Sequence, residues 1–67
     1  MIEIVVNGKG QSHPAPLSVA ELLHEMALGG KKVAVERNGE IIPRGSHGAI
    51  LLTDGDRLEI VVAVGGG

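Results

Sequence analysis

The sequence contains one segment with helical periodicity, and this limits the folds open to the chain more than any other feature. Ser18 begins a capping box that Glu21 completes three residues later. The apolar stripe behind it has the spacing of one helix face and consists of Val19, Leu22, Leu23 and Met26. A Gly-Gly pair at positions 29–30 supplies a stop signal. We therefore expect a helix over residues 19–28.

Strand signals lie on both sides of this helix. Two Asn-Gly pairs, Asn7-Gly8 and Asn38-Gly39, are strong hairpin signals because both turn positions need a positive φ. The expected strands cover residues 1–6, 9–13, 33–35, 40–42, 49–52 and 58–64, with a polar loop at 44–48 and a turn at 53–56. One helix of this length covers only one face of such a sheet. The sequence therefore predicts an α+β fold, a mixed β-sheet with one main α-helix packed on one face.

The alternation of side chains in the last expected strand predicts which residues face away from the helix. One phase of this strand is expected to pack under the helix and comprises Leu58, Ile60, Val62 and Val64. Val61 and Ala63 then lie on the uncovered face, and Val5 has the corresponding phase in the first strand. An apolar patch on an open sheet face is typical of a docking surface. We therefore predict that Val5, Val61 and Ala63 contact a partner, the alternative being ordinary scattered exposed valines.

Composition excludes several functions for this 67-residue chain. It has no cysteine, so a disulfide, a thiolate zinc site or a cysteine nucleophile is impossible. It also has no aromatic residue and a formal net charge of −2, which argues against nucleic acid as a partner. Neither a membrane-spanning run nor a secretory signal is evident, so we expect no membrane partner and a cytoplasmic location.

The remaining polar residues do not form a catalytic pattern. His13, His24 and His47 lie at the end of an expected strand, in the helix and in a loop, without metal-ligand spacing, so we expect solvated histidines and no metal site. Asp54 and Asp56 flank a glycine in a turn, where aspartate bonds to nearby backbone. We therefore expect no catalytic residue, and a chain that is not an enzyme.

The sequence ends in three glycines, Gly65, Gly66 and Gly67. An unanchored glycine run at a terminus is expected to be flexible, and its carboxyl group is flanked by no side chain. Three extended residues reach about 10 Å, which suits entry into a channel too narrow for ordinary side chains. The alternative is a frayed chain end without function.

Together these features resemble the ThiS family, the sulfur carrier proteins of thiamin biosynthesis. The ordered motifs that carry the resemblance are residues 6–8 (VNG), 18–23 (SVAELL), 33–39 (VAVERNG), 41–44 (IIPR), 54–61 (DGDRLEIV) and the terminal glycines. The resemblance implies the ubiquitin-like β-grasp fold, in which the first and last strands pair in parallel beneath one helix. It also implies two parts, a β-grasp domain over residues 1–64 and a flexible glycine tail over residues 65–67.

The resemblance implies a carrier on which other enzymes act. An adenylyltransferase related to ubiquitin-activating enzymes uses ATP to adenylate the terminal carboxylate, here on Gly67. A sulfur-donor system then supplies the sulfur of a thiocarboxylate, which thiazole synthase consumes; the carrier itself binds no cofactor. Gly66 and Gly67 occupy the two matched glycine positions, and Gly65 becomes an additional hinge. The sequence alone leaves two alternatives open, the related sulfur carrier of molybdopterin synthesis and a β-grasp binding module without carrier function.

Overall fold

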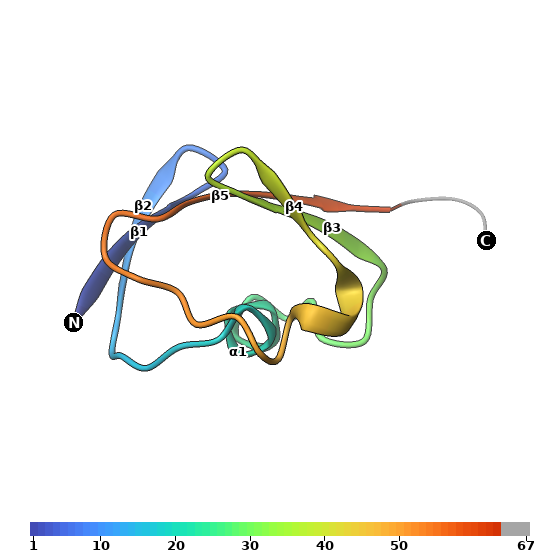
Figure 1. The fold of residues 1–67 in the computed structure, drawn as a ribbon, viewed down its shortest axis with the longest axis horizontal. Coiled ribbons are helices and arrows are strands. Elements are labelled where there is room, and N and C mark those ends of the chain that lie inside the picture. The colour runs from blue at the N-terminus through green and yellow to red at the C-terminus, as the bar shows by residue number, and fades with distance from the viewer. Residues whose placement is uncertain (64–67) are drawn as a thin grey trace.

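The computed structural model describes residues 1–63, which form a five-stranded mixed sheet with one α-helix across one face (Figure 1). In chain order the elements are β1 (Ile2–Val6), β2 (Lys9–His13), α1 (Val19–Glu25), β3 (Val33–Arg37), β4 (Glu40–Ile42), the 3-10 helix η1 (Arg44–Ser46) and β5 (Arg57–Val62). The strand order is β2-β1-β5-β3-β4, with β1 and β5 parallel and the other pairs antiparallel. The predicted fold class is confirmed. The predicted boundary at residue 64 and the flexible tail lie outside the described residues.

Both Asn-Gly pairs form the predicted two-residue hairpins. Asn7 and Gly8 have φ values of 51° and 83°, and Asn38 and Gly39 have values of 50° and 88°. This left-handed backbone matches the right-handed twist of the flanking strands. The hairpins therefore set the register of β1 against β2 and of β3 against β4 from local sequence alone.

The core between the sheet and the helix is entirely aliphatic. Its buried members come from α1, from three strands and from two loop positions: Ile2, Ile4, Val6, Leu17, Val19, Leu22, Leu23, Val35, Leu52, Leu58 and Ile60. The predicted helix stripe is confirmed, since Val19 and Leu22 are fully buried and Met26 packs against the cluster. The helix and the segment that follows η1 lie on the same side of the sheet, which leaves the other face open (Figure 1).

The helix is shorter than predicted, because the chain turns before the Gly-Gly pair is reached. Ala27 has a φ of 61°, and its N–H donates to the carbonyl oxygen of His24 at 3.0 Å. The N–H of Leu28 donates to the oxygen of Leu23 at 2.8 Å. These two bonds form a Schellman motif, in which the left-handed position is usually glycine. The expected end at residue 28 was therefore wrong, and α1 ends at Glu25.

Residues 49–52, predicted as a strand, are not part of the sheet. The backbone of this segment forms hydrogen bonds with the start of the helix instead. The N–H of Val19 donates to the carbonyl oxygen of Ile50 at 3.0 Å. The N–H of Leu52 donates to Leu17 at 2.8 Å, which leaves a single bridge between Ser18 and Leu51. The prediction failed because an apolar run of this length also suits a segment that packs across a helix end.

Asp56 is a buried carboxylate at the start of β5. One carboxylate oxygen accepts from Arg37 Nε and the Thr53 N–H, both at 2.8 Å, and the other accepts from Asn38 Nδ2 at 3.0 Å and Thr53 Oγ1 at 3.1 Å. Burial raises the pKa of Asp56, but the combined hydrogen bonds outweigh this effect and lower the pKa below its usual value. Asp56 therefore does more than form the predicted turn, because it joins that turn to the β3–β4 hairpin.

We expect Ala27→Gly to stabilise the protein by about 1 kcal/mol, because glycine adopts the left-handed conformation without the cost that a Cβ imposes. Urea unfolding followed by circular dichroism measures the change. Ala20 lies within α1, so Ala20→Gly is a matched control that should lower stability. An Ala27→Gly variant no more stable than the parent would contradict this account of the helix end.

We expect Asp56→Asn to destabilise the protein by about 1–3 kcal/mol at pH 7, since it weakens hydrogen bonds to a buried charge. The folded-state pKa is lowered, so the carboxylate stabilises the fold above the unfolded-state value of 3.8, and this contribution is lost as the pH falls through the folded value. The difference in unfolding free energy between parent and variant should therefore shrink below about pH 4. Asp54, which is exposed, provides the control Asp54→Asn; a difference that stays constant between pH 7 and 3 would refute the prediction.

Candidate partner-docking surface

The central strand β5 is held along its whole length, up to the last described residue. It pairs with β1 in parallel near its start, where Val6 lies beside Leu58. Along β3 the antiparallel register runs from Arg37 opposite Leu58 to Val33 opposite Val62. Beyond this, the N–H of Ala63 donates to the oxygen of Lys32 at 2.9 Å. The sheet therefore fixes the position of Ala63, the last described residue.

Asn7 extends the contact between β1 and β5 beyond the regular ladder. Its Oδ1 accepts from the N–H of Ile60 at 2.7 Å, and its Nδ2 donates to the oxygen of Ile60 at 3.0 Å. The side chain thus supplies the pair of bonds that another strand residue would supply. The sequence predicted Asn7 only as a turn residue, because no local pattern indicates a bond to a residue so distant in the chain.

The end of β5 presents apolar side chains on the uncovered face. Val61 is 62% exposed, as predicted, and lies opposite Ala34 of β3. Ile41 of β4 is 67% exposed and lies opposite Glu36, which is two residues from Ala34 and on the same face. We call Ala34, Ile41 and Val61 the open-face patch; Ala63, also exposed, follows it along the chain. Sequence reasoning missed Ala34 and Ile41, although the register of a two-residue hairpin places both on the same face of the sheet.

The structure does not place Val5 with the patch. Val5 is half-buried and lies beside Arg57, four residues before Val61 on the same strand. At about 3.3 Å per residue this separates the two valines by roughly 13 Å. Val62, predicted to pack under the helix, is 38% exposed. That expectation was wrong because β5 extends past the helix (Figure 1).

Two glutamates lie beside the open-face patch. Glu36 of β3 is directly opposite Glu59 of β5, and both point to the uncovered face. Like charges at directly opposed positions destabilise a strand pair. A basic side chain placed against this pair would remove the repulsion, so the face favours a partner that is apolar and basic.

The three histidines differ in their surroundings. His24 is exposed and His13 is half-buried, with its Nδ1 4.0 Å from Glu25 Oε2. His47 is buried, so the prediction of a solvated side chain was wrong for this residue. The loop that carries His47 packs on the helix start. There the backbone carbonyl oxygen of His47 accepts from the N–H of Ala20 at 2.9 Å. Among residues 1–63 no group of three or more histidine, aspartate or glutamate side chains is arranged to hold a metal ion.

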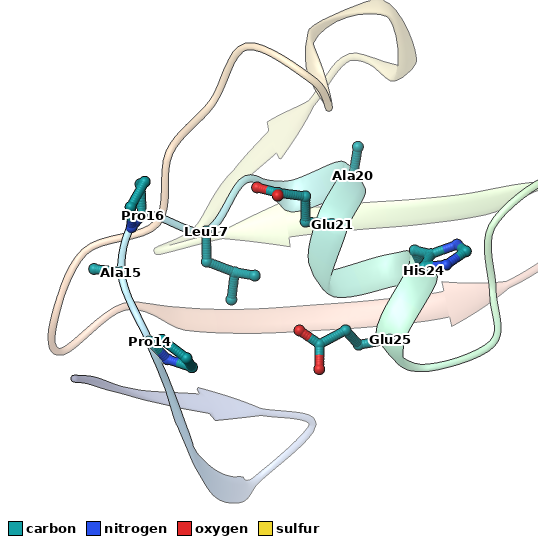
Figure 2. A pocket seen from close by; sticks show the side chains of 8 residues that line it. All are labelled: Pro14, Ala15, Pro16, Leu17, Ala20, Glu21, His24 and Glu25. Atoms are coloured by element: carbon teal, nitrogen blue, oxygen red, sulfur yellow. The ribbon is translucent and has the colours of Figure 1, made fainter.

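A groove of about 460 Å³ lies between α1 and the segment of residues 14–17 (Figure 2). Glu21, His24 and Glu25 project from the helix along it. The Glu21 carboxylate accepts from the N–H of Ser18 at 2.8 Å and so completes the predicted capping box. The groove contains no serine, threonine or lysine that would act as a nucleophile. Of its polar side chains, Glu21 caps the helix start and Glu25 lies beside His13 of β2.

Within the described part of the chain, no helix has the length and apolar character needed to cross a membrane.

A mixed sheet of this order, with a parallel central pair beneath one helix, defines the protein as a ubiquitin-like β-grasp domain. The chain belongs to the ThiS family, whose family model matches residues 2–67. The crystal structure of a thiamine biosynthesis protein (ThiS) from Geobacter metallireducens is similar to it, with a TM-score of 0.81 and 35% identity over 98% of this chain and 100% of that one. The family assignment made from the sequence is confirmed, and it supports the prediction of a sulfur carrier.

Two further relatives are much longer proteins. A thiazole synthase of Paramagnetospirillum magneticum is 44% identical over 66 residues, and one of Magnetococcus marinus is 36% identical over 66 residues. The match covers 98% of this chain, but the chain spans only 20% of the length of each relative. A domain of this family is thus joined to a larger protein in both.

We expect Val61→Asp to change the free energy of unfolding by no more than about 1 kcal/mol, because the side chain is exposed on the open face. Val35 lies on the opposite face of the sheet and is fully buried, so Val35→Asp is the contrasting variant and should not fold. Thermal melting by circular dichroism distinguishes the two. Comparable losses at both positions would mean that Val61 belongs to the core.

Proposed function

We propose that this chain is a sulfur carrier of thiamin biosynthesis whose Gly67 carboxylate is the group that carries sulfur. In the proposed cycle the carboxylate attacks the α-phosphate of ATP on an activating enzyme, which releases pyrophosphate and forms an acyl-adenylate. A sulfide equivalent from a sulfur-donor system then displaces AMP, giving a thiocarboxylate. Thiazole synthase takes the sulfur from that group. ATP is therefore a substrate of the activating enzyme and no cofactor resides on the carrier.

The observation that carries this proposal is the ThiS family match, which extends through residue 67 and so includes all three glycines. The chain has no cysteine, so it has no thiol on which sulfur could be held. The sheet holds β5 firmly as far as Ala63, which gives the following four residues a fixed starting point. These features suit a carrier that presents its last residues to partner enzymes.

Thiazole synthase is the proposed consumer because two relatives with that name contain a ThiS-like region. Proteins joined in one chain in some organisms commonly act together where they are separate. The open-face patch and the Glu36–Glu59 pair are the proposed contact surface, since a desolvated apolar centre with a charged margin is typical of such contacts. The activating enzyme is proposed from the family resemblance. No observation favours the molybdopterin carrier, and both named functions among the relatives point to thiamin.

The proposal is tested by intact-mass measurement of the purified chain after incubation with ATP, sulfide and the activating enzyme of the same organism. We expect the mass to increase by the difference between sulfur and oxygen, and fragmentation to place the change on Gly67. Omission of ATP is the control and should leave the mass unchanged. An unmodified chain under complete conditions would count against the carrier function.

Removal of Gly67 tests whether reach matters in addition to the Gly-Gly sequence. The shortened chain still ends in two glycines, but its carboxylate is drawn back by roughly 3.5 Å. Since misplacement of about 1 Å can cost on the order of a hundredfold in rate, we expect adenylation to fall by at least about tenfold. ATP–pyrophosphate exchange measures the rate. Exchange at the parental rate would show that Gly65-Gly66 satisfies the enzyme by itself.

The folded Val61→Asp variant tests the docking surface. A carboxylate is costly to desolvate in an interface, so binding to thiazole synthase should weaken by at least about tenfold. Ala20→Asp, on the exposed side of α1, is the matched control and should bind as the parent does. Calorimetry with purified thiazole synthase measures both. Equal affinity of the two variants would exclude the open face from the contact.

A further inference from the structure

A second hollow, of about 210 Å³, lies between the end of α1 and η1. Its polar side chains are Lys31, Arg44 and His47, and none of the residues that line it is acidic. Gly29 and Gly30 form another part of its wall. In Figure 1 the segment that joins α1 to β3 and the 3-10 helix η1 lie at the end of the molecule toward which β5 runs. We call this hollow the basic pocket; it plays no part in the proposed docking surface.

Among the described residues, no carboxylate neutralises the positive charges of the basic pocket. Within residues 1–63 neither Lys31 nor Arg44 has a carboxylate within 4.0 Å, whereas the buried Asp56 is paired with Arg37. Both side chains are exposed, and both line the hollow. Two cations that line one hollow, with no carboxylate partner among the described residues, favour the binding of an anion.

His47 provides an independent observation. The residue is 8% exposed, and its Nε2 is buried without a hydrogen-bond partner among the residues that the structure describes. A buried polar atom without a partner costs free energy, so such atoms call for an explanation. In the tautomer that carries hydrogen on Nε2, this atom is a donor and requires an acceptor. His47 lines the pocket, so an oxyanion bound there would supply the acceptor once the ring turned Nε2 toward it.

The backbone adds further donors. The N–H groups of Gly29 and Gly30 make no hydrogen bond with any residue between 1 and 63, and both residues line the pocket. Arginine, lysine and free backbone N–H groups are the donors that proteins use for phosphate. A water molecule occupies about 30 Å³ in the liquid, so a hollow of 210 Å³ accommodates a phosphate group with part of its hydration shell.

We propose that Lys31, Arg44 and His47, with the backbone of Gly29 and Gly30, form a binding site for a phosphate group. The sources of such a group include inorganic phosphate, pyrophosphate and a nucleotide. The pocket adjoins the end of β5, because Lys32, next to Lys31, accepts the hydrogen bond from Ala63. The proposal concerns the isolated chain and does not depend on sulfur transfer.

The test is an NMR titration of the ¹⁵N-labelled chain with sodium phosphate, against sodium chloride of equal ionic strength. We expect saturable shifts in phosphate at Gly29, Gly30, Lys31 and Arg44, and only small, linear shifts in chloride. Arg44→Gln should weaken phosphate binding by at least about tenfold, since it removes charge-assisted hydrogen bonds. Arg57→Gln is the matched control, because Arg57 is exposed on the opposite face and likewise has no ion pair within the described residues. The control should bind as the parent does.

Parallel titrations with pyrophosphate and ATP identify the source. Equal affinities would assign the site to a single phosphate group, and tighter binding of pyrophosphate or ATP would assign it to a polyphosphate. Three outcomes would overturn the proposal: shifts that follow ionic strength whatever the anion, saturable shifts confined to the groove along residues 14–25, or equal weakening by the two arginine variants. Circular dichroism melting of both variants confirms that each is folded under the conditions of the titration.

Discussion

The buried carboxylate of Asp56 is the interaction on which the arrangement of this small sheet depends. It accepts hydrogen bonds from the β3–β4 hairpin and from its own turn, at the residue before β5 begins. A charge buried without such partners would destabilise the fold strongly. With them, Asp56 joins two segments that lie far apart in sequence and sets where the central strand enters the sheet. The positions of Val61 and Ala63 follow from that entry point.

The remainder of the fold compensates for its small size by pairing the backbone donors at the start of its helix. A helix of seven residues is marginal in isolation. Here the first-turn N–H groups are all paired, with Ile50, with His47 and with the Ser18 hydroxyl. The segment that supplies two of these acceptors also contributes Leu52 to the core. The segment of residues 47–52 thus accepts hydrogen bonds from the start of the helix and also covers part of the aliphatic core.

The two surfaces for which functions are proposed lie on different sides of the sheet. The open-face patch lies on the side of the sheet away from the helix, and the basic pocket lies on the helix side. Both are close to the end of β5, since Val61 belongs to that strand and the residue after Lys31 bonds to Ala63. This arrangement suits the proposed carrier function, because a partner could bind one surface without covering the other.

Local sequence by itself determined the hairpins, the capping box, the alternation in β1 and the family to which the chain belongs. The first three depend on residues a few positions apart, whose geometry is set by φ preference or by side-chain period. The family assignment depends on the order of such local motifs along the whole chain. Only the tertiary structure decided that residues 49–52 cap the helix, that Val5 and Val61 lie apart, and that Asn7 and Asp56 bond to distant parts of the chain. It also decided that His47 is buried and that Lys31 and Arg44 line one pocket. These outcomes depend on which segments meet across the sheet, and a periodic pattern specifies the face a residue occupies but not its neighbour on that face.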